Sequence, residues 1–145
     1  MKTNRYILLF LIFFTINLYG GSDKLVKKMN YETSYKKALE KAKESGKPIM
    51  MMIGQEGCPY CNKFESKTLI TKTIDSKVKK DFIPLTVLKF KDKDKYPPRL
   101  SPSGVPTVLF IEPNSQEVFY KSFGYKSKRE YKVELKKALN IFNQK

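Results

Sequence analysis

The residues of this 145-residue chain with the clearest capacity for chemistry are Cys58 and Cys61, its only two cysteines. They stand in the sequence Cys58-Pro59-Tyr60-Cys61, one helical turn apart, so their sulfur atoms can form a disulfide and release it again. A disulfide across two intervening residues closes too short a loop to stabilise a fold. The pair is therefore expected to be reactive rather than structural.

The two cysteines are expected to differ in role because they differ in position. Cys58 is predicted at the start of a helix, with Pro59 at the first helical position, where a missing N–H has no cost. Unpaired backbone N–H groups and the helix dipole would stabilise a Cys58 thiolate, the attacking species in disulfide exchange. Cys61 lies one turn further in, where we expect a buried, protonated thiol. We predict that Cys58 is the nucleophile and Cys61 the resolving thiol.

The neighbours of the cysteines are predicted to support this site. Pro59 stiffens the turn, and Tyr60 is expected to be exposed and to contact a partner. Glu56 opposes a Cys58 thiolate by like charge, whereas Lys63 favours it. The sequence does not rank these two electrostatic effects.

A second motif, Gly104-Val105-Pro106-Thr107, opens a predicted strand about 45 residues later. A bond between any residue and proline can be cis, and this one is Val105–Pro106. The backbone groups of Val105 would be free to hold an extended substrate segment against the cysteines as an added strand. On its own this motif is weak, but together with the cysteine pair it becomes specific.

Other interpretations of the cysteines are a metal site and an inert pair. Zinc needs four ligands, usually Cys or His, and the chain has two Cys and no His. A copper(I) site could combine the cysteines with Met50, Met51 and Met52. Three consecutive methionines cannot all face one way on a strand, so they are more simply core residues. We expect no metal and no bound cofactor.

Residues 1–22 are predicted to be a secretory signal peptide, followed by one domain at residues 23–145. A basic start, an apolar run and small residues follow one another: Lys2 with Arg5, Tyr6 to Leu18, and Gly20-Gly21-Ser22. The apolar run has about 13 residues, whereas a membrane-spanning helix needs about 20. Cleavage is predicted before Asp23, and an uncleaved anchor is the alternative. We expect a periplasmic protein, in a compartment where disulfides persist.

The formal charge of the chain is +15. Loss of residues 1–22 would remove two cations and no acidic residue, which lowers the charge to +13. The cations are nearly all lysines spread over every segment, whereas proteins that bind nucleic acids usually gather arginines and aromatic residues on one face. We therefore expect a solvated basic surface and no nucleic-acid partner.

The pattern of the remaining chain predicts an α/β sandwich with a mixed sheet. Residues 23–30 are polar and are expected to be a loose lead-in, and Tyr31 continues the spacing of the first helix. Pro84 indicates an edge strand or a bulge. Helices are predicted at 34–45, 58–80 with a break near 71–73, and 127–143; strands at 49–53, 82–88, 106–112 and 117–123; and a long loop at 89–103.

In these residues the chain resembles the thioredoxin superfamily, in particular exported bacterial thioredoxin-like proteins, over about residues 31–142. The shared pattern is Tyr35-x-x-Ala38-Leu39-x-x-Ala42, Gly46-Lys47-Pro48, the apolar run 49–53, Cys58 to Cys61, and Thr68-Leu69. The resemblance implies that Pro106 is the cis-proline of that family and faces the cysteines. It also implies that Gly124 is the glycine after the last strand.

The chain departs from this family at several positions. Cytoplasmic thioredoxins have a buried Asp where this chain has Met52, which puts the usual proton acceptor of the resolving thiol in doubt. Glu56 or water could serve instead. Gly57 stands where those proteins have Trp. The Pro-Tyr dipeptide is similar to that of glutaredoxins, but no Gly-Gly-x-Asp follows for binding glutathione.

These features predict a monomeric, periplasmic thiol–disulfide oxidoreductase that acts on protein disulfides or dithiols. A reductase is the first expectation, and the resemblance implies a membrane thiol protein as its electron donor. An oxidase comes second, and an isomerase is least expected because the chain has no room for a dimerisation domain. The alternative class is a thioredoxin-fold binding, chaperone or metal-carrying assembly module without redox turnover.

Overall fold

The computed structural model describes residues 22–144. Its strands are β1 (Ile49–Gly54), β2 (Ile83–Leu88), β3 (Thr107–Ile111) and β4 (Val118–Phe123). Its helices are α1 (Asp23–Met29), α2 (Tyr35–Ser45), α3 (Pro59–Phe64), the π-helix η1 (Glu65–Leu69), α4 (Lys72–Asp81), the 3-10 helix η2 (Pro98–Leu100) and α5 (Lys128–Asn143). The predicted signal peptide lies outside the described residues, except for Ser22.

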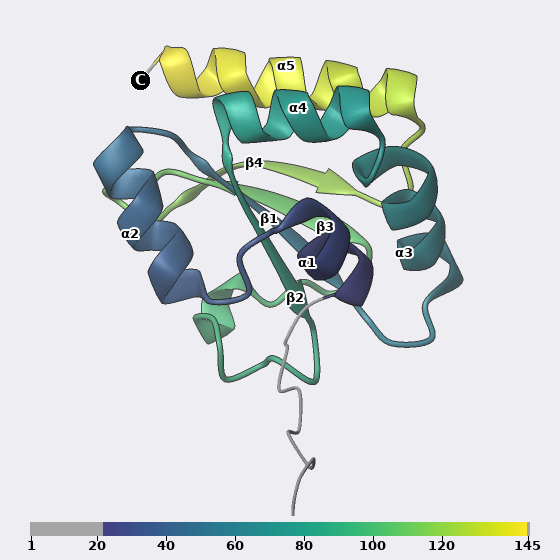
Figure 1. Ribbon diagram of the computed structural model, residues 1–145. Helices are drawn as coiled ribbons and strands as arrows, with labels where there is room; N and C mark the ends of the chain where they lie inside the picture. The colour runs from purple at the N-terminus through teal and green to yellow at the C-terminus, as the bar shows by residue number, and fades with distance from the viewer. Residues whose placement is uncertain (1–21, 145) are drawn as a thin grey trace, which may run out of the picture.

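The four strands form one mixed sheet in the order β2-β1-β3-β4 (Figure 1). β1 pairs in parallel with β2 and antiparallel with β3, and β3 pairs antiparallel with β4. The predicted mixed sheet and the edge position of Pro84 in β2 are therefore confirmed. At this edge the Pro84 carbonyl accepts a hydrogen bond from the N–H of Glu32 rather than from a further strand.

Each face of the sheet carries its own hydrophobic core. One core contains buried side chains of α1, α3, η1, α4 and α5, and the other those of α2 and of the segment that leads into η2. Met50 and Met52 point into the first core and Met51 into the second, because successive side chains of a strand alternate between faces. All three side chains are fully buried, as expected for core methionines.

The prediction of a loose lead-in at residues 23–30 is wrong, because Asp23–Met29 form helix α1. Asp23 lies in the first turn and Lys27 and Lys28 in the last, where each charge complements the helix dipole. The helix ends at Asn30, which adopts the left-handed conformation. A single fully buried side chain, Leu25, anchors this short helix in the core.

Tyr31 does not continue the pattern of the first predicted helix. Tyr35, Ala38 and Ala42 of α2 belong to the second core, whereas Tyr31 precedes the helix and belongs to the first. The backbone of the adjacent Glu32 bridges to β2, which turns the chain toward that face. Regular spacing across a helix start therefore does not place residues on one face.

The long helix predicted after Cys58 is divided into three parts, and the break predicted near residues 71–73 is confirmed by the start of α4 at Lys72. The π-helix η1 directly continues α3. In α5, Ser127 forms the N-cap within a residue of the predicted start.

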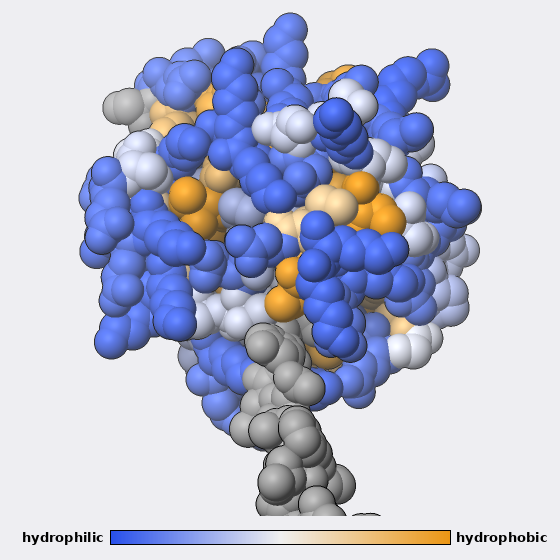
Figure 2. Space-filling model, in the orientation of Figure 1, coloured by the Kyte–Doolittle hydropathy of each residue, from blue (hydrophilic) through white to orange (hydrophobic). Residues whose placement is uncertain are grey.

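The surface is mainly hydrophilic on the face drawn in Figure 2, where apolar residues show only as small patches. Among residues 22–144, no helix is long and apolar enough to cross a membrane.

Candidate active site

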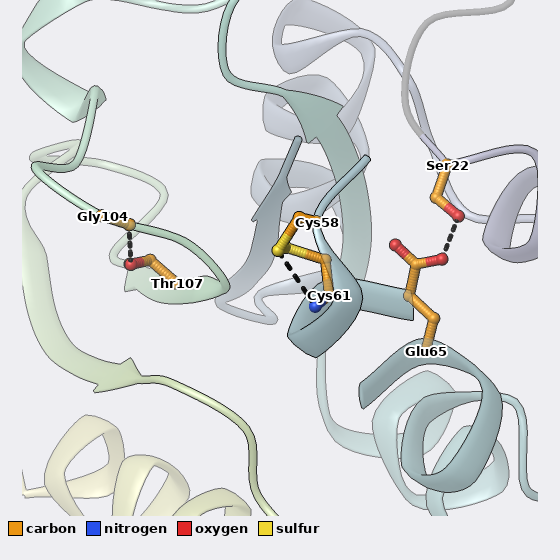
Figure 3. Close-up of a disulfide and its surroundings, with 6 residues drawn as sticks. All are labelled: Ser22, Cys58, Cys61, Glu65, Gly104 and Thr107. Atoms are coloured by element: carbon orange, nitrogen blue, oxygen red, sulfur yellow. Dashed lines mark hydrogen bonds between the residues drawn. A yellow bond between two sulfur atoms is a disulfide. The ribbon is translucent and has the colours of Figure 1, made fainter. Parts of the chain in front are cut away.

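Cys58 and Cys61 are joined by a disulfide, with their Cα atoms 5.3 Å apart (Figure 3). Cys58 is the N-cap residue of α3, and its Sγ atom accepts a hydrogen bond from the Cys61 N–H at 3.1 Å. Cys58 is half-buried, whereas Cys61 is only 1% exposed. Cys58 is therefore the more accessible residue of the two, and its sulfur lies where a helix start stabilises negative charge.

The loop before the disulfide turns at Gly57, whose φ of +72° favours glycine. No heavy atom lies within 4 Å of a Cβ built on this residue, so its conformation alone requires a glycine. Pro59 occupies the first turn of α3, as predicted, and Tyr60 projects from the same turn with 64% of its surface exposed. The turn therefore presents an aromatic side chain to solvent.

The charges near the cysteines are each paired with another group. The exposed Glu56 carboxylate forms an ion pair with Lys91 at 3.0 Å. Lys63 places its ammonium 4.6 Å from the centre of the Tyr125 ring. The carboxylate of Glu56 is thus partly neutralised, and solvent screens both charges.

The Gly104–Thr107 segment lies beside the disulfide (Figure 3). The Val105–Pro106 peptide bond is cis. Thr107 pairs with Ile53, next to the end of β1 from which the cysteine loop departs, and its hydroxyl donates to the Gly104 carbonyl at 2.7 Å. The sheet thus brings the two predicted motifs to one end of the molecule.

Further contacts fix this segment against the last strand. The N–H of Gly124 donates to the Pro106 carbonyl at 2.8 Å, and Gly124 has a φ of +79°. Pro106 and Thr107 are buried, whereas Val105 is half-buried. The side chain of Phe123 closes over Gly104, because a Cβ atom there would lie 3.0 Å from the Phe123 ring.

The sequence interpretation missed Glu65, a buried acid on the other side of the cysteine helix. Its side chain is only 4% exposed, and its Oε2 atom accepts a hydrogen bond from the Ser22 hydroxyl at 2.5 Å (Figure 3). Burial raises the pKa of Glu65, while the Ser22 hydrogen bond and the charge of Lys24 oppose the rise. The available signal was its spacing, since a residue four positions after Cys61 lies on the same helical face.

Among residues 22–144, no three His, Cys, Asp or Glu side chains are arranged to bind a metal ion. The reactive group of this site is the Cys58–Cys61 disulfide, and the proline segment lies beside it. This arrangement can exchange a disulfide with another dithiol through the accessible sulfur.

Comparisons with known proteins agree with this geometry. Residues 35–139 match the family model described as a thioredoxin-like domain. Anterior gradient protein 3 of Mus musculus is 31% identical over 83 residues, which cover 56% of this chain and 48% of that protein. The chain spans about half the length of the curated relatives it matches.

Solved structures share the fold. A thioredoxin from Thermus thermophilus superposes with a TM-score of 0.62 at 24% identity, over 74% of this chain and 85% of that one. A DsbH oxidoreductase superposes with a TM-score of 0.64 at 19% identity, over 75% and 83% of the two chains. With its mixed sheet, its disulfide at the start of α3 and its match over residues 35–139, this chain belongs to the thioredoxin-like domain family.

Proposed function

We propose that this protein is an exported thiol–disulfide oxidoreductase that reduces disulfides in protein substrates. The observation that carries the proposal is the disulfide between a half-buried Cys58 and a buried Cys61, placed beside the Val105–Pro106 segment. A structural disulfide would have both sulfurs enclosed and would link distant parts of the chain. This one links residues three positions apart, and one of its two cysteines is only half-buried.

The reaction runs in two exchanges. In the reduced protein, the Cys58 thiolate attacks a substrate disulfide, forms a mixed disulfide and releases one substrate thiolate. Cys61 then loses its proton and attacks Cys58 Sγ, which forms the Cys58–Cys61 disulfide and releases the second substrate thiolate. The substrate gains two electrons and the cysteine pair loses two, so an external dithiol must reduce the pair again.

Substrate binding uses the surface around Cys58. The backbone of Val105 can pair with an extended segment of the substrate, which adds a short strand beside the cysteines. Tyr60 offers an exposed aromatic side chain for apolar contact with that segment. Both groups act on any extended chain, so the proposed substrates are protein disulfides rather than one small molecule.

The proposed location is the periplasm. The signal peptide predicted at residues 1–22 would direct export to this compartment and would then be cleaved. A reductase in an oxidising compartment needs a steady supply of electrons, and a membrane thiol protein is the proposed donor. The proposed working form is a monomer without a bound cofactor, because the cysteine pair itself carries the electrons.

Cysteine variants test the activity. We expect Cys58→Ser to abolish reduction of a protein disulfide such as that of insulin, and Cys61→Ser to accumulate a mixed disulfide on Cys58 that mass spectrometry detects. Ser101→Ala, at an exposed loop position, is the matched control. Full activity of Cys58→Ser would contradict the proposal and favour a binding or chaperone role.

The reduction potential of the cysteine pair tests the direction. A reductase is expected to have a potential near that of thioredoxin, about −270 mV, whereas a potential near about −120 mV belongs to an oxidant. Equilibration with glutathione buffers, followed by thiol alkylation and mass analysis, gives this value. A potential near the higher figure would contradict the reductase direction and leave the oxidoreductase activity intact.

A further inference from the structure

Glu65 and Cys61 border the same small space inside the molecule. A methyl group built on Gly54 would lie 3.7 Å from the Glu65 Oε1 atom and 3.8 Å from the Cys61 Cβ atom. Gly54 ends β1 and has no side chain, so nothing of its own occupies this position. The carboxylate thus approaches Cys61 from the side opposite to the Gly104–Thr107 segment (Figure 3).

Ser22 holds this carboxylate from the other side. Its hydroxyl donates to Oε2 at 2.5 Å, and within residues 22–144 it is the only hydrogen-bond donor to the Glu65 carboxylate. Ser22 is itself fixed, because its N–H reaches the Thr86 hydroxyl at 3.5 Å and its carbonyl accepts from the Val26 N–H at 2.9 Å. Oε2 is therefore occupied, whereas Oε1 faces the space at Gly54.

A polar cavity connects Glu65 with the surface. It has a volume of about 300 Å³, and Ser22, Glu65 and Asn62 are among its lining residues. The charged groups that face it are Asp23 and Lys24 from α1, Glu56 from the loop after β1 and Lys91 from the segment after β2. Glu56 and Lys91 are exposed, so a proton on Glu65 can pass to solvent by this route.

The chemistry of the second exchange requires a base near Cys61. Its thiol must lose a proton before it can attack, yet the residue is 1% exposed and cannot pass the proton directly to bulk water. Glu56 is exposed and paired with Lys91. The buried carboxylate of Glu65 borders the same position beside Gly54 as Cys61. Burial also raises the pKa of Glu65, which makes it a stronger base than an exposed carboxylate.

Building on the proposed function, we propose that the Glu65 carboxylate accepts the proton of the Cys61 thiol during resolution of the mixed disulfide. In a chain that keeps Ser22, the hydroxyl of this residue also holds the carboxylate in place. The proton passes between the two groups at the position beside Gly54 that both of them border. Cys61 Sγ then bonds to Cys58 Sγ, the bond from Cys58 to the substrate sulfur breaks, and the substrate leaves as a thiolate. The proton leaves Glu65 through the polar cavity.

The test separates the two exchanges by single-turnover kinetics. The reduced protein is mixed with a peptide disulfide, the reaction is quenched with acid, and mass spectrometry follows the mixed disulfide over time between pH 5 and 9. In Glu65→Gln we expect resolution at least tenfold slower near neutral pH, with accumulation of the mixed disulfide and an unchanged first exchange. The slowing should shrink toward pH 9, where the Cys61 thiol ionises unaided.

Two further variants test the path and the role of Ser22. Gly54→Ala places a methyl group at ordinary contact distance from Glu65, Cys61 and Met52, so it should fold and still slow resolution severalfold. Ser22→Ala removes a hydrogen bond that stabilises the carboxylate, so the pH midpoint of resolution should rise. Glu117→Gln, at an exposed position outside the site, is the matched control and should resolve at the wild-type rate.

Several outcomes would overturn the proposal. Wild-type resolution in Glu65→Gln excludes Glu65 as the acceptor, and slowing that is equal at all pH values assigns it a structural role only. Wild-type kinetics in Gly54→Ala exclude the path across Gly54, and an unmoved midpoint in Ser22→Ala excludes the contribution of Ser22. Failure of the proposed function looks different, since no mixed disulfide would then form on Cys58 in the wild-type protein.

Discussion

At the scale of single residues, Glu65 should reduce stability whenever it is ionised. Burial raises its pKa above the ordinary value of 4.5, so the folded state binds the proton more tightly than the unfolded state. Stability therefore falls as the pH rises from about 4.5 through the pKa of the folded state. A glutamine at this position has no such dependence.

We therefore predict that the stability difference between Glu65→Gln and the wild type shifts in favour of the variant between pH 4 and pH 8. Urea denaturation of the oxidised proteins at several pH values measures this difference. Glu117→Gln, at an exposed turn, is the control and should show no such trend. A constant difference between Glu65→Gln and the wild type over this range would contradict the prediction.

Two buried tyrosines of the first core differ in how their hydroxyl groups are satisfied. The Tyr131 hydroxyl donates to the Met50 sulfur at 3.1 Å, whereas the Tyr31 hydroxyl has no hydrogen-bond partner among residues 22–144. Burial raises the pKa of both groups far above the ordinary range, so neither ionises. An unsatisfied buried hydroxyl costs about 1–3 kcal/mol.

Tyr31→Phe should therefore raise the free energy of unfolding by about 1 kcal/mol, because it removes the unsatisfied hydroxyl and keeps the ring. Tyr131→Phe, which removes a bonded hydroxyl from the same core, is the matched comparison and should not stabilise. Urea denaturation at neutral pH measures both. A loss of stability in Tyr31→Phe would show that its hydroxyl is satisfied in solution.

At the scale of elements, α5 begins with a reciprocal pair of hydrogen bonds. The Ser127 hydroxyl accepts from the Glu130 N–H at 3.4 Å, and the Glu130 carboxylate accepts from the Ser127 N–H at 2.7 Å. The hydrogen bonds from Ser127 also lower the pKa of Glu130. Two otherwise unpaired N–H groups of the helix start are thereby satisfied.

Ser127→Ala should lower the free energy of unfolding by about 1 kcal/mol, the usual cost of losing an N-cap side chain. Chemical denaturation measures it, with Ser101→Ala as the control because Ser101 lies in an exposed loop. Equal stability of the two variants would mean that the first turn of α5 is not stabilised by this cap.

The elements that the sequence predicts well are those with strong terminal signals. Gly46 and Pro48 end α2, and Ser127 begins α5, each within a residue of the prediction. Helix α1 was not predicted because only one of its side chains, Leu25, is buried. A seven-residue helix with one buried side chain shows no repeating pattern of apolar residues in its sequence. Its contact with η1 depends on the tertiary structure.

At the scale of the whole molecule, the fold class and the two reactive motifs could be predicted, but the environment of Cys61 could not. Cys58, Cys61 and Pro106 stand in short motifs that local chemistry explains. The setting of Glu65 depends on three elements: Ser22 precedes α1 as its N-cap residue, β1 ends at Gly54, and η1 begins with Glu65 itself. The contacts of Glu65 with Ser22 and Gly54 arise from the packing of these elements, and no sequence pattern predicts them.

The start of the domain gives the last prediction. Cleavage before Asp23, as the sequence predicts, would remove Ser22 together with its bonds to Glu65, Thr86 and Val26. A chain that begins at Asp23 should therefore be less stable than one that begins at Gly21 by about 1–3 kcal/mol, because it loses the Ser22 carbonyl that accepts from Val26 and the buried hydrogen bond to Glu65.

Urea denaturation of the two chains measures this cost, and Ser22→Ala in the longer chain separates the side-chain bond from the backbone contribution. The truncation should cost more than Ser22→Ala, since the carbonyl that begins α1 is lost only in the truncation. Equal stability of the two chains would mean that α1 forms without Ser22. The intact mass of the exported protein shows whether its chain begins before or after Ser22. A mature chain that keeps Ser22 would retain the hydrogen bond from this residue to Glu65.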